Sequence, residues 1–229
     1  MNLRWERYEE IKGKVAHYME RRNLSKVPID PFEFAQKLGV NVAAYSSLSR
    51  AKREGLRRAG DEGVVAVSPV DGRSWIFYND EKPCNRIRWT MFHEIGHYLL
   101  DHDDSVDDAV KEAEATFFAK YAIAPPPLIR EFGAESSEDV ARIFGVSREA
   151  SWYVWNYYLN WLFHTCQKQL NWYDEKLCSL FNTTQCSSSF RVIVRSLGKR
   201  KDQKGCVEER RRGWKSTSAF DMKEKPSDH

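Results

Sequence analysis

R-I-R-W-T-M-F-H-E-I-G-H-Y-L-L, residues 86–100, is the stretch that decides the fold of this chain. With His93 taken as the zero direction, its apolar residues project between about 120° and 260° around a helix axis. These apolar residues are Ile87, Met91, Phe92, Ile95, Tyr98 and Leu99. His93, Glu94 and His97 project from the opposite side. The spacing therefore predicts a helix over about residues 85–101 that buries one face and presents these three polar side chains on the other.

The polar face of this helix spells H-E-x-x-H, with His93 and His97 four residues apart. Residues four apart lie about 40° from each other around a helix, so both imidazoles can reach one ion. A zinc ion held by two imidazoles and a third ligand retains a position for water, and an adjacent carboxylate can accept the proton of that water. The motif predicts a zinc peptidase in which His93 and His97 bind the metal and Glu94 is the catalytic base.

The third metal ligand must come from elsewhere in the chain. His102 stands one position short of the histidine that the H-E-x-x-H-x-x-G-x-x-H class requires, and Asp101 lies about 12 Å along the helix axis from His93. A helix predicted over about residues 106–123 offers Glu112 and Glu114, which project about 160° apart. Glu112 falls beside a stripe of small residues that would let another helix approach, namely Ala109, Ala115, Ala119 and Ala122. This geometry favours Glu112, with Glu114, Asp101 and His102 as the alternatives.

Peptide hydrolysis also needs a group that stabilises the oxyanion. The candidates for this role, or for contact with the substrate, are Tyr98, Tyr121, His102 and Arg86, and the sequence does not choose among them. The segment 74–78, predicted as a strand just before the metal helix, is a candidate for binding an extended substrate as an added strand.

The remaining segments predict an α+β fold. Helices are expected over residues 3–22, 31–38, 128–132, 137–144, 147–163 and 173–181. Short strands at 40–45, 63–68 and 74–78, with a basic loop at 50–58, predict a small antiparallel sheet. We expect a mainly helical, zincin-like metallopeptidase domain over residues 1–125. A helical, helix-turn-helix-like subdomain is expected over 126–186 and a basic tail over 187–229.

Composition indicates a globular protein of a reducing compartment. The chain has 229 residues, of which 41% are apolar, and five cysteines that never occur in C-x-x-C spacing. The first residues read as a charged helix rather than a leader, and no apolar stretch reaches the length of a membrane span. These features predict a cytoplasmic protein with no membrane partner, and they leave the oligomeric state open.

The basic residues are concentrated at the end of the chain. From Arg191 onward there are 12 lysines and arginines against 6 acidic residues, whereas the whole chain has a net charge of only +3. Few apolar residues follow Leu197. This composition predicts a disordered tail, because it cannot bury enough surface to offset the entropy of ordering.

Two segments resemble the ImmA/IrrE family of metallopeptidases. R-I-R-W-T-M-F-H-E-I-G-H-Y-L-L is similar to the family's arginine-rich lead into its zinc helix, and E-A-E-A-T-F-F-A-K-Y-A-I-A-P, residues 112–125, resembles its downstream signature. The resemblance implies a gluzincin-like zinc endopeptidase with Glu112 as the third ligand. It also implies a substrate, a helix-turn-helix repressor whose cleavage relieves repression of a mobile element or of stress genes.

The segment 137–163 suggests an alternative function, because its two predicted helices are joined by Gly145 and Val146 as in a helix-turn-helix. A recognition helix needs basic and polar side chains, whereas this one offers Arg148 among many aromatic residues. The composition argues against direct binding of nucleic acid. The alternative is a regulator that binds DNA or docks a protein through this segment.

Overall fold

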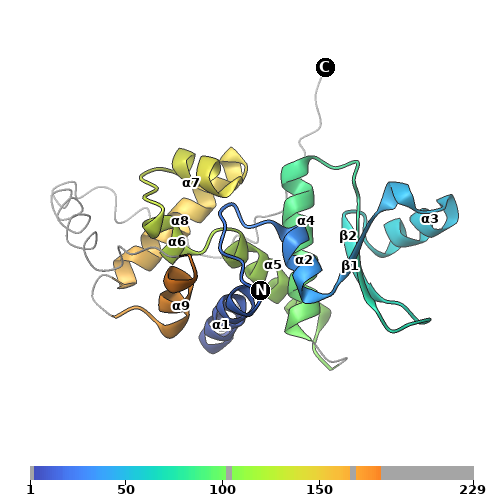
Figure 1. Cartoon of the computed structure of the whole chain (residues 1–229), viewed down its shortest axis with the longest axis horizontal. Helices are drawn as coiled ribbons and strands as arrows, with labels where there is room; N and C mark the ends of the chain where they lie inside the picture. The colour runs from blue at the N-terminus through green and yellow to red at the C-terminus, as the bar shows by residue number, and fades with distance from the viewer. Residues whose placement is uncertain (1–2, 102–104, 166–168, 182–229) are drawn as a thin grey trace, which may run out of the picture.

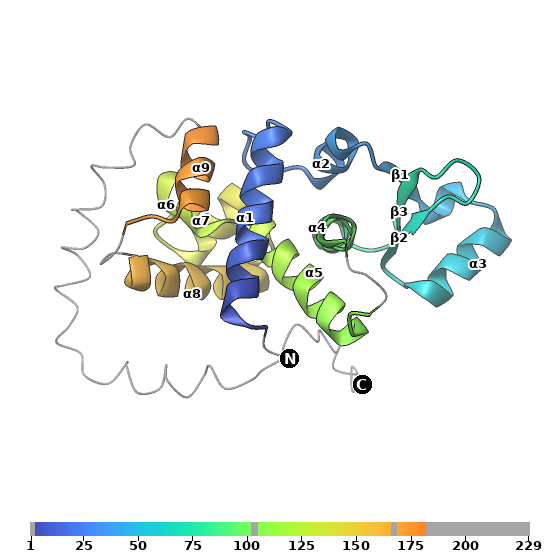
Figure 2. The same cartoon turned by 90° about the horizontal axis from the view of Figure 1, so that it is seen from below.

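The computed structural model describes residues 3–101, 105–165 and 169–181. A central helix, α4 (Cys84–Leu100), has the sheet on one side and most of the other helices on the opposite side (Figures 1 and 2). The sheet contains β1 (Asn41–Ala44), β2 (Gly63–Val67) and β3 (Ser74–Tyr78), and α3 (Arg50–Ala59) lies beyond it. A short 3₁₀ helix, Tyr45–Ser47, follows β1. The predicted α+β class is confirmed.

The other described helices build the larger part of the molecule. They are α1 (Trp5–Arg21), α2 (Pro31–Leu38), α5 (Asp108–Ile123), α6 (Pro126–Glu131), α7 (Ser137–Phe144), α8 (Arg148–Thr165) and α9 (Trp172–Leu180). Helix α1 packs against α5 and α9, and the buried apolar side chains form one cluster that extends from α1 to α9. The division at residues 125 and 126 therefore stays a prediction. The predicted tail over 187–229 lies outside the described residues, within which no helix is long and apolar enough to cross a membrane.

Helix α4 buries the face that its sequence predicts. Met91, Phe92 and Ile95 are fully buried, and Leu99 is nearly so. Helix α4 packs against α5, α2 and the strands β2 and β3. The core thus fixes the rotation of α4 about its axis, which determines where its histidines point.

The sheet is mixed, so the prediction of an antiparallel sheet was wrong in one pairing. Its order is β1-β3-β2, with β2 antiparallel to β3 and β1 parallel to β3. A short turn at 68–73 joins β2 to β3 and favours an antiparallel pair. The longer connection through α3 lets β1 reach the far edge of β3 in parallel orientation, and the alternation of residues carries no information on strand direction.

The position of β3 also corrects the proposed role of segment 74–78 in binding substrate. Both hydrogen-bonding edges of β3 are occupied, Ile76 pairing with Val42 on one side and Val65 on the other. A central strand cannot accept an added strand. The edge strand that packs against α4 is β2.

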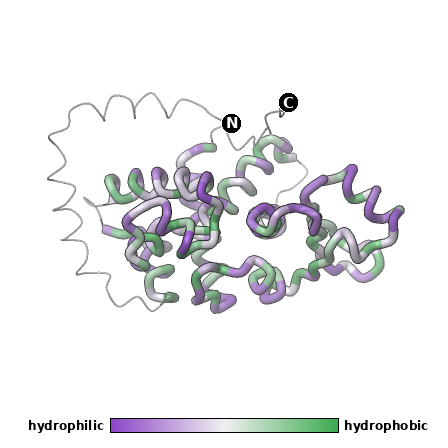
Figure 3. The backbone as a smooth tube through the Cα atoms, turned by 90° about the horizontal axis from the view of Figure 1, so that it is seen from above, coloured by the Kyte–Doolittle hydropathy of each residue, from purple (hydrophilic) through white to green (hydrophobic). Residues whose placement is uncertain are grey.

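The predicted basic loop at 50–58 is instead helix α3. None of its residues is buried, and Leu56 is its one large apolar side chain, too little to mark a buried helical face in the sequence. Arginine, lysine, glutamate, leucine and alanine, which make up nine of its ten residues, are strong helix formers. In Figure 3 the tube of α3 is mostly hydrophilic.

Candidate metal centre

Helix α4 places the two histidines of the motif side by side. The Nε2 atoms of His93 and His97 lie 3.0 Å apart, and the side chains are 17% and 18% exposed. The rings meet edge to face, with centroids 4.7 Å apart. Both imidazoles therefore present a ring nitrogen at one partly open point.

Helix α5 brings Glu112 to the same point. Its Oε2 lies 3.2 Å from Nε2 of His93 and its Oε1 lies 3.2 Å from Nε2 of His97. Hydrogen bonds from His93 and His97 hold the pKa of Glu112 well below its usual range. The hydrogen bond to Glu112 and the nearby carboxylates outweigh burial and raise the pKa of His97. The ligating atoms of the three residues all lie within 4.8 Å of one another.

Glu114, the alternative two residues further on, points away from this cluster. Its side chain is 5% exposed and receives two hydrogen bonds from Arg7 of α1, Nε to Oε1 at 2.7 Å and Nη2 to Oε2 at 2.5 Å. This buried ion pair connects α1 to α5. Asp101 ends α4 in a left-handed conformation, with φ of 47°, and His102 lies outside the described residues.

A glycine within the motif explains how closely α5 approaches. A Cβ at Gly96 would lie 3.2 Å from the Cα and carbonyl oxygen of Ala115 and 3.2 Å from Cβ of Phe118. Contacts of this length to backbone atoms leave almost no room for a side chain. Gly96 and the small Ala115 thus allow Glu112 to reach the histidines from the neighbouring helix.

Glu94 lies between the histidine pair and the edge strand β2. It is 7% exposed, and a Cβ at Gly63, the first residue of β2, would lie 2.5 Å from Cγ2 of Thr90 and 3.4 Å from Cγ of Glu94. Burial raises the pKa of Glu94, against the opposing effects of His93 and His97. A buried carboxyl group with a raised pKa is a stronger base than an exposed glutamate and is suited to proton transfer.

A comparison with protein families decides the affiliation. The family model described as IrrE N-terminal-like domain, Peptidase M78, matches residues 35–153, a span that includes both histidines, Glu94 and Glu112. The chain belongs to this family. It is a metallopeptidase of the ImmA/IrrE type, which confirms the resemblance drawn from its motifs. A search of curated proteins finds none that matches.

The cluster of this ImmA/IrrE metallopeptidase fits a divalent metal. Nitrogen and oxygen ligands around a tetrahedral zinc, at bond lengths of about 2.0–2.1 Å, lie about 3.3 Å apart. Here the two Nε2 atoms lie 3.0 Å apart, and each lies 3.2 Å from a different oxygen of the Glu112 carboxylate. Nδ1 of His93 is buried with no hydrogen-bond partner among the described residues, so the polar contacts of this ring run through Nε2. Two imidazoles and a carboxylate are also a typical catalytic zinc set.

The structure gives the other candidate site residues different surroundings. The hydroxyl of Tyr121, which is 1% exposed, donates to Oδ1 of Asp174 at 3.3 Å, so Tyr121 belongs to the core. Arg86 forms an ion pair with Glu62 at 2.6 Å. Tyr98 is partly buried against the core. Tyr121 and Arg86 are therefore engaged with Asp174 and Glu62 and do not join the histidine cluster.

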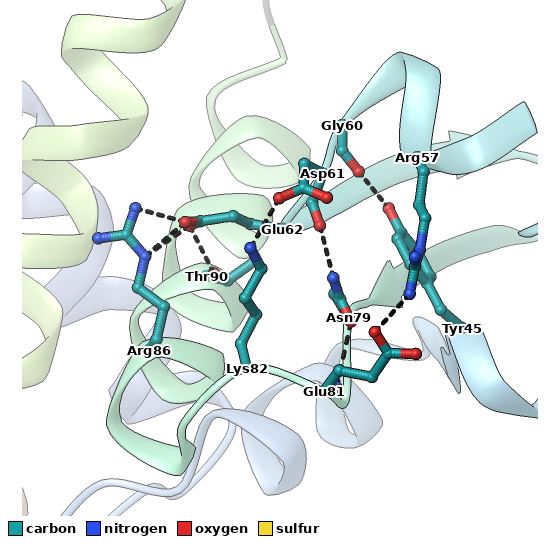
Figure 4. A network of polar contacts seen from close by, with 10 residues as sticks. All are labelled: Tyr45, Arg57, Gly60, Asp61, Glu62, Asn79, Glu81, Lys82, Arg86 and Thr90. Atoms are coloured by element: carbon teal, nitrogen blue, oxygen red, sulfur yellow. Dashed lines mark hydrogen bonds and ion pairs between the residues drawn. The ribbon is translucent and has the colours of Figure 1, made fainter. Parts of the chain in front are cut away.

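A network at the start of β2 was not foreseen from the sequence (Figure 4). Glu62 accepts from Nε of Arg86 at 2.7 Å and from the hydroxyl of Thr90 at 3.3 Å, both on α4. Because Gly63 follows directly and contacts Thr90 and Glu94, this network fixes β2 against the helix that bears the site. In the sequence, the one hint that β2 lies close to α4 is Gly63, which opens the valine-rich strand G-V-V-A-V. A glycine in a strand often marks a place where another part of the chain approaches closely.

Proposed function

We propose that the chain is a zinc-dependent endopeptidase. His93, His97 and Glu112 would hold the metal, and Glu94 would act as the general base. The observation that supports this best is the convergence of three ligand atoms from two helices, with a buried carboxyl group beside them. A bound zinc ion would supply a Lewis acid that polarises the peptide carbonyl and lowers the pKa of water.

Glu94 would move the proton in this scheme. Its carboxylate accepts a proton from the attacking water and later delivers it to the nitrogen of the leaving amine. Burial favours the protonated form and raises the pKa of Glu94, so the group holds a proton more readily than an exposed glutamate does. The edge strand β2, rather than β3, is the place where an extended substrate can pair beside Glu94.

The substitution Glu94→Gln tests the role of the base. It keeps the size of the side chain and removes its ability to accept the proton. We expect the variant to bind zinc in the same stoichiometry as the wild type and to lose at least about 100-fold in turnover. Full peptidase activity in the variant would remove Glu94 from the mechanism.

For the substrate, we propose a helix-turn-helix transcriptional repressor whose cleavage relieves repression of a mobile element or of stress genes. The support is membership of the ImmA/IrrE type of metallopeptidase. Co-expression with any helix-turn-helix regulator encoded beside this chain, followed by mass spectrometry of the products, would locate a cut. The Glu94→Gln variant is the matched control. An intact regulator beside the zinc-loaded wild-type protein would refute this substrate.

The alternative function, a regulator acting through residues 137–163, remains a second proposal. Helices α7 and α8 are joined through Gly145 in a left-handed conformation, with φ of 63°, and the turn of a helix-turn-helix often contains a glycine. Helix α8 exposes Trp152, Tyr153 and Phe163, which favours a protein partner over DNA. A salt-dependent mobility shift of a DNA probe would instead support DNA binding.

A further inference from the structure

Helix α3 is a strongly basic element at the surface of the peptidase. It carries five cations, Arg50, Lys52, Arg53, Arg57 and Arg58, against one acidic residue, Glu54, and none of its ten residues is buried. It lies at the end of the molecule, beyond the sheet from α4 (Figures 1 and 2). Gly55 in its middle lowers its intrinsic helical stability. Because none of the residues of α3 is buried, packing in the core does not explain why so many cations are concentrated on this helix.

Two of the cations hold α3 in place. Arg53 donates through Nη2 to the carbonyl of Leu48 at 3.3 Å, and Arg57 forms an ion pair with Glu81 at 2.7 Å. Their Nε atoms are buried. These two arginines are turned toward the protein and are committed to structure.

The other three cations face solvent. Lys52 and Arg58 are exposed and form no ion pair within the part of the chain that the structure describes. Arg50 is 91% exposed and pairs with Glu54 on the same helix at 2.8 Å, an arrangement that contributes little in water. Lys52 and Arg58 project about 120° apart, on the side of α3 away from Arg53 and Arg57, whereas Arg50 projects within about 20° of Arg57 and reaches solvent from the first turn.

The network in Figure 4 fixes this side of α3 relative to the active site. Three residues, 60–62, connect α3 to β2, and each is anchored: the carbonyl of Gly60 accepts from the hydroxyl of Tyr45 at 2.6 Å, and Asp61 pairs with Lys82 at 2.7 Å. Glu62 pairs with Arg86 of α4. The cations of α3 therefore stand at a defined position next to the strand that contacts Glu94.

We propose that the exposed side of α3 binds an acidic segment of the protein substrate that flanks the bond to be cut, with Lys52 and Arg58 as the main contacts and Arg50, at the first turn, as a third. This inference rests on the proposed peptidase function. Because α3 contacts β2 and leads into it through residues 60–62, a substrate paired with β2 can place carboxylates that flank the cut site near these cations. Charge complementarity of this kind sets specificity and the rate of encounter.

The surroundings of α3 favour an acidic peptide over nucleic acid. The helix is about 15 Å long. Glu54 and Glu81 lie on it or against it, and Asp80 lies next to Glu81 in the chain. A continuous phosphate backbone would meet these carboxylates, whereas a peptide can place a few acidic side chains on the cations alone.

Fluorescence anisotropy tests the surface without a known substrate. The probes are a labelled octaglutamate peptide, an octaglutamine peptide and a short DNA duplex, each titrated with the full chain. The test variant is Arg50→Glu/Lys52→Glu/Arg58→Glu. The control is Arg21→Glu/Arg22→Glu/Lys26→Glu, which makes the same change of charge at exposed positions around the end of α1.

We expect the α3 variant to lose about ten-fold or more in affinity for octaglutamate and the control to lose less than about two-fold. No binding of octaglutamate by the wild type, or an equal loss in both variants, would overturn the proposal. Tighter binding of the duplex than of octaglutamate, abolished in the α3 variant, would also overturn it in favour of nucleic acid.

Cleavage of a proteome-derived peptide library by the zinc-loaded protein supplies the second readout. We expect acidic residues to be enriched on one side of the cut sites, and this enrichment to disappear in the α3 variant while cleavage continues. Enrichment that persists in the α3 variant would contradict the proposal. Absence of any cleavage would count against the peptidase function, while the anisotropy result still decides whether α3 binds acidic peptides.

Discussion

Glu112 and Glu114 lie two residues apart on α5, yet their removal should have opposite effects. Glu112 is 63% exposed and contacts the two histidines, whereas Glu114 is 5% exposed and pairs with Arg7. Glu112→Ala should therefore weaken metal binding strongly and leave the metal-free fold almost unchanged. Glu114→Ala should retain the metal site and destabilise the fold.

The expected magnitudes follow from these contacts. Removing one partner of a buried ion pair costs about 3–5 kcal/mol. Arg7 is 27% exposed and also contacts Glu10, so part of its charge stays solvated, and about 2–3 kcal/mol is expected for Glu114→Ala. For Glu112→Ala, a zinc site bound by about 10–16 kcal/mol through four ligands loses about 3 kcal/mol per ligand, or roughly 100-fold in affinity.

The assay combines two titrations on each variant. Urea denaturation after treatment with a chelator gives the free energy of unfolding, and competition with a chromogenic chelator gives the zinc affinity below the unfolding transition. A loss of stability in metal-free Glu112→Ala as large as that in Glu114→Ala would refute the assignment. So would a 100-fold loss of zinc affinity in folded Glu114→Ala.

Two further predictions concern burial and close packing. Burial raises the pKa of Asp174 to about 6, so its contribution to stability is present below pH 4 and lost as the pH rises through 6. Wild-type protein should therefore lose up to about 3 kcal/mol relative to Asp174→Asn between about pH 4 and pH 7, measured by urea denaturation, and parallel pH profiles would contradict this. Gly96→Ala should push α5 away through contact with Ala115 and weaken zinc binding about ten-fold, whereas Gly55→Ala, which meets nothing within 4 Å, should leave zinc binding unchanged in the same chelator competition. Equal zinc affinities in the two glycine variants would contradict the role of close approach.

The sequence predicted α4 well because its two histidines project away from the apolar side chains that the helix buries. The apolar face runs through Met91 and Ile95, and the histidines fall where a core residue would not be placed. Glu112 and Glu114 project about 160° apart around one helix, so the sequence also indicated that only one of them could face the histidines. Such periodic information is local, so it can be read from residue spacing alone.

The features that the sequence did not predict depend on contacts between distant segments. The parallel pairing of Val42 with Ile76 follows from the route of the chain through α3. The ion pair of Glu62 with Arg86 joins residues 24 positions apart, which no periodicity records. Tyr121 has a polar tip that suited an oxyanion role, and only the packing of α9 shows that its hydroxyl serves Asp174.

X-ray absorption at the zinc edge of the purified, zinc-loaded chain tests the central claim most directly. The account predicts one zinc per chain, with two imidazole nitrogens and one carboxylate at about 2.0–2.2 Å, and loss of this signal in His93→Ala/His97→Ala. A chain that takes up no zinc, or a zinc spectrum unchanged in that double variant, would contradict it.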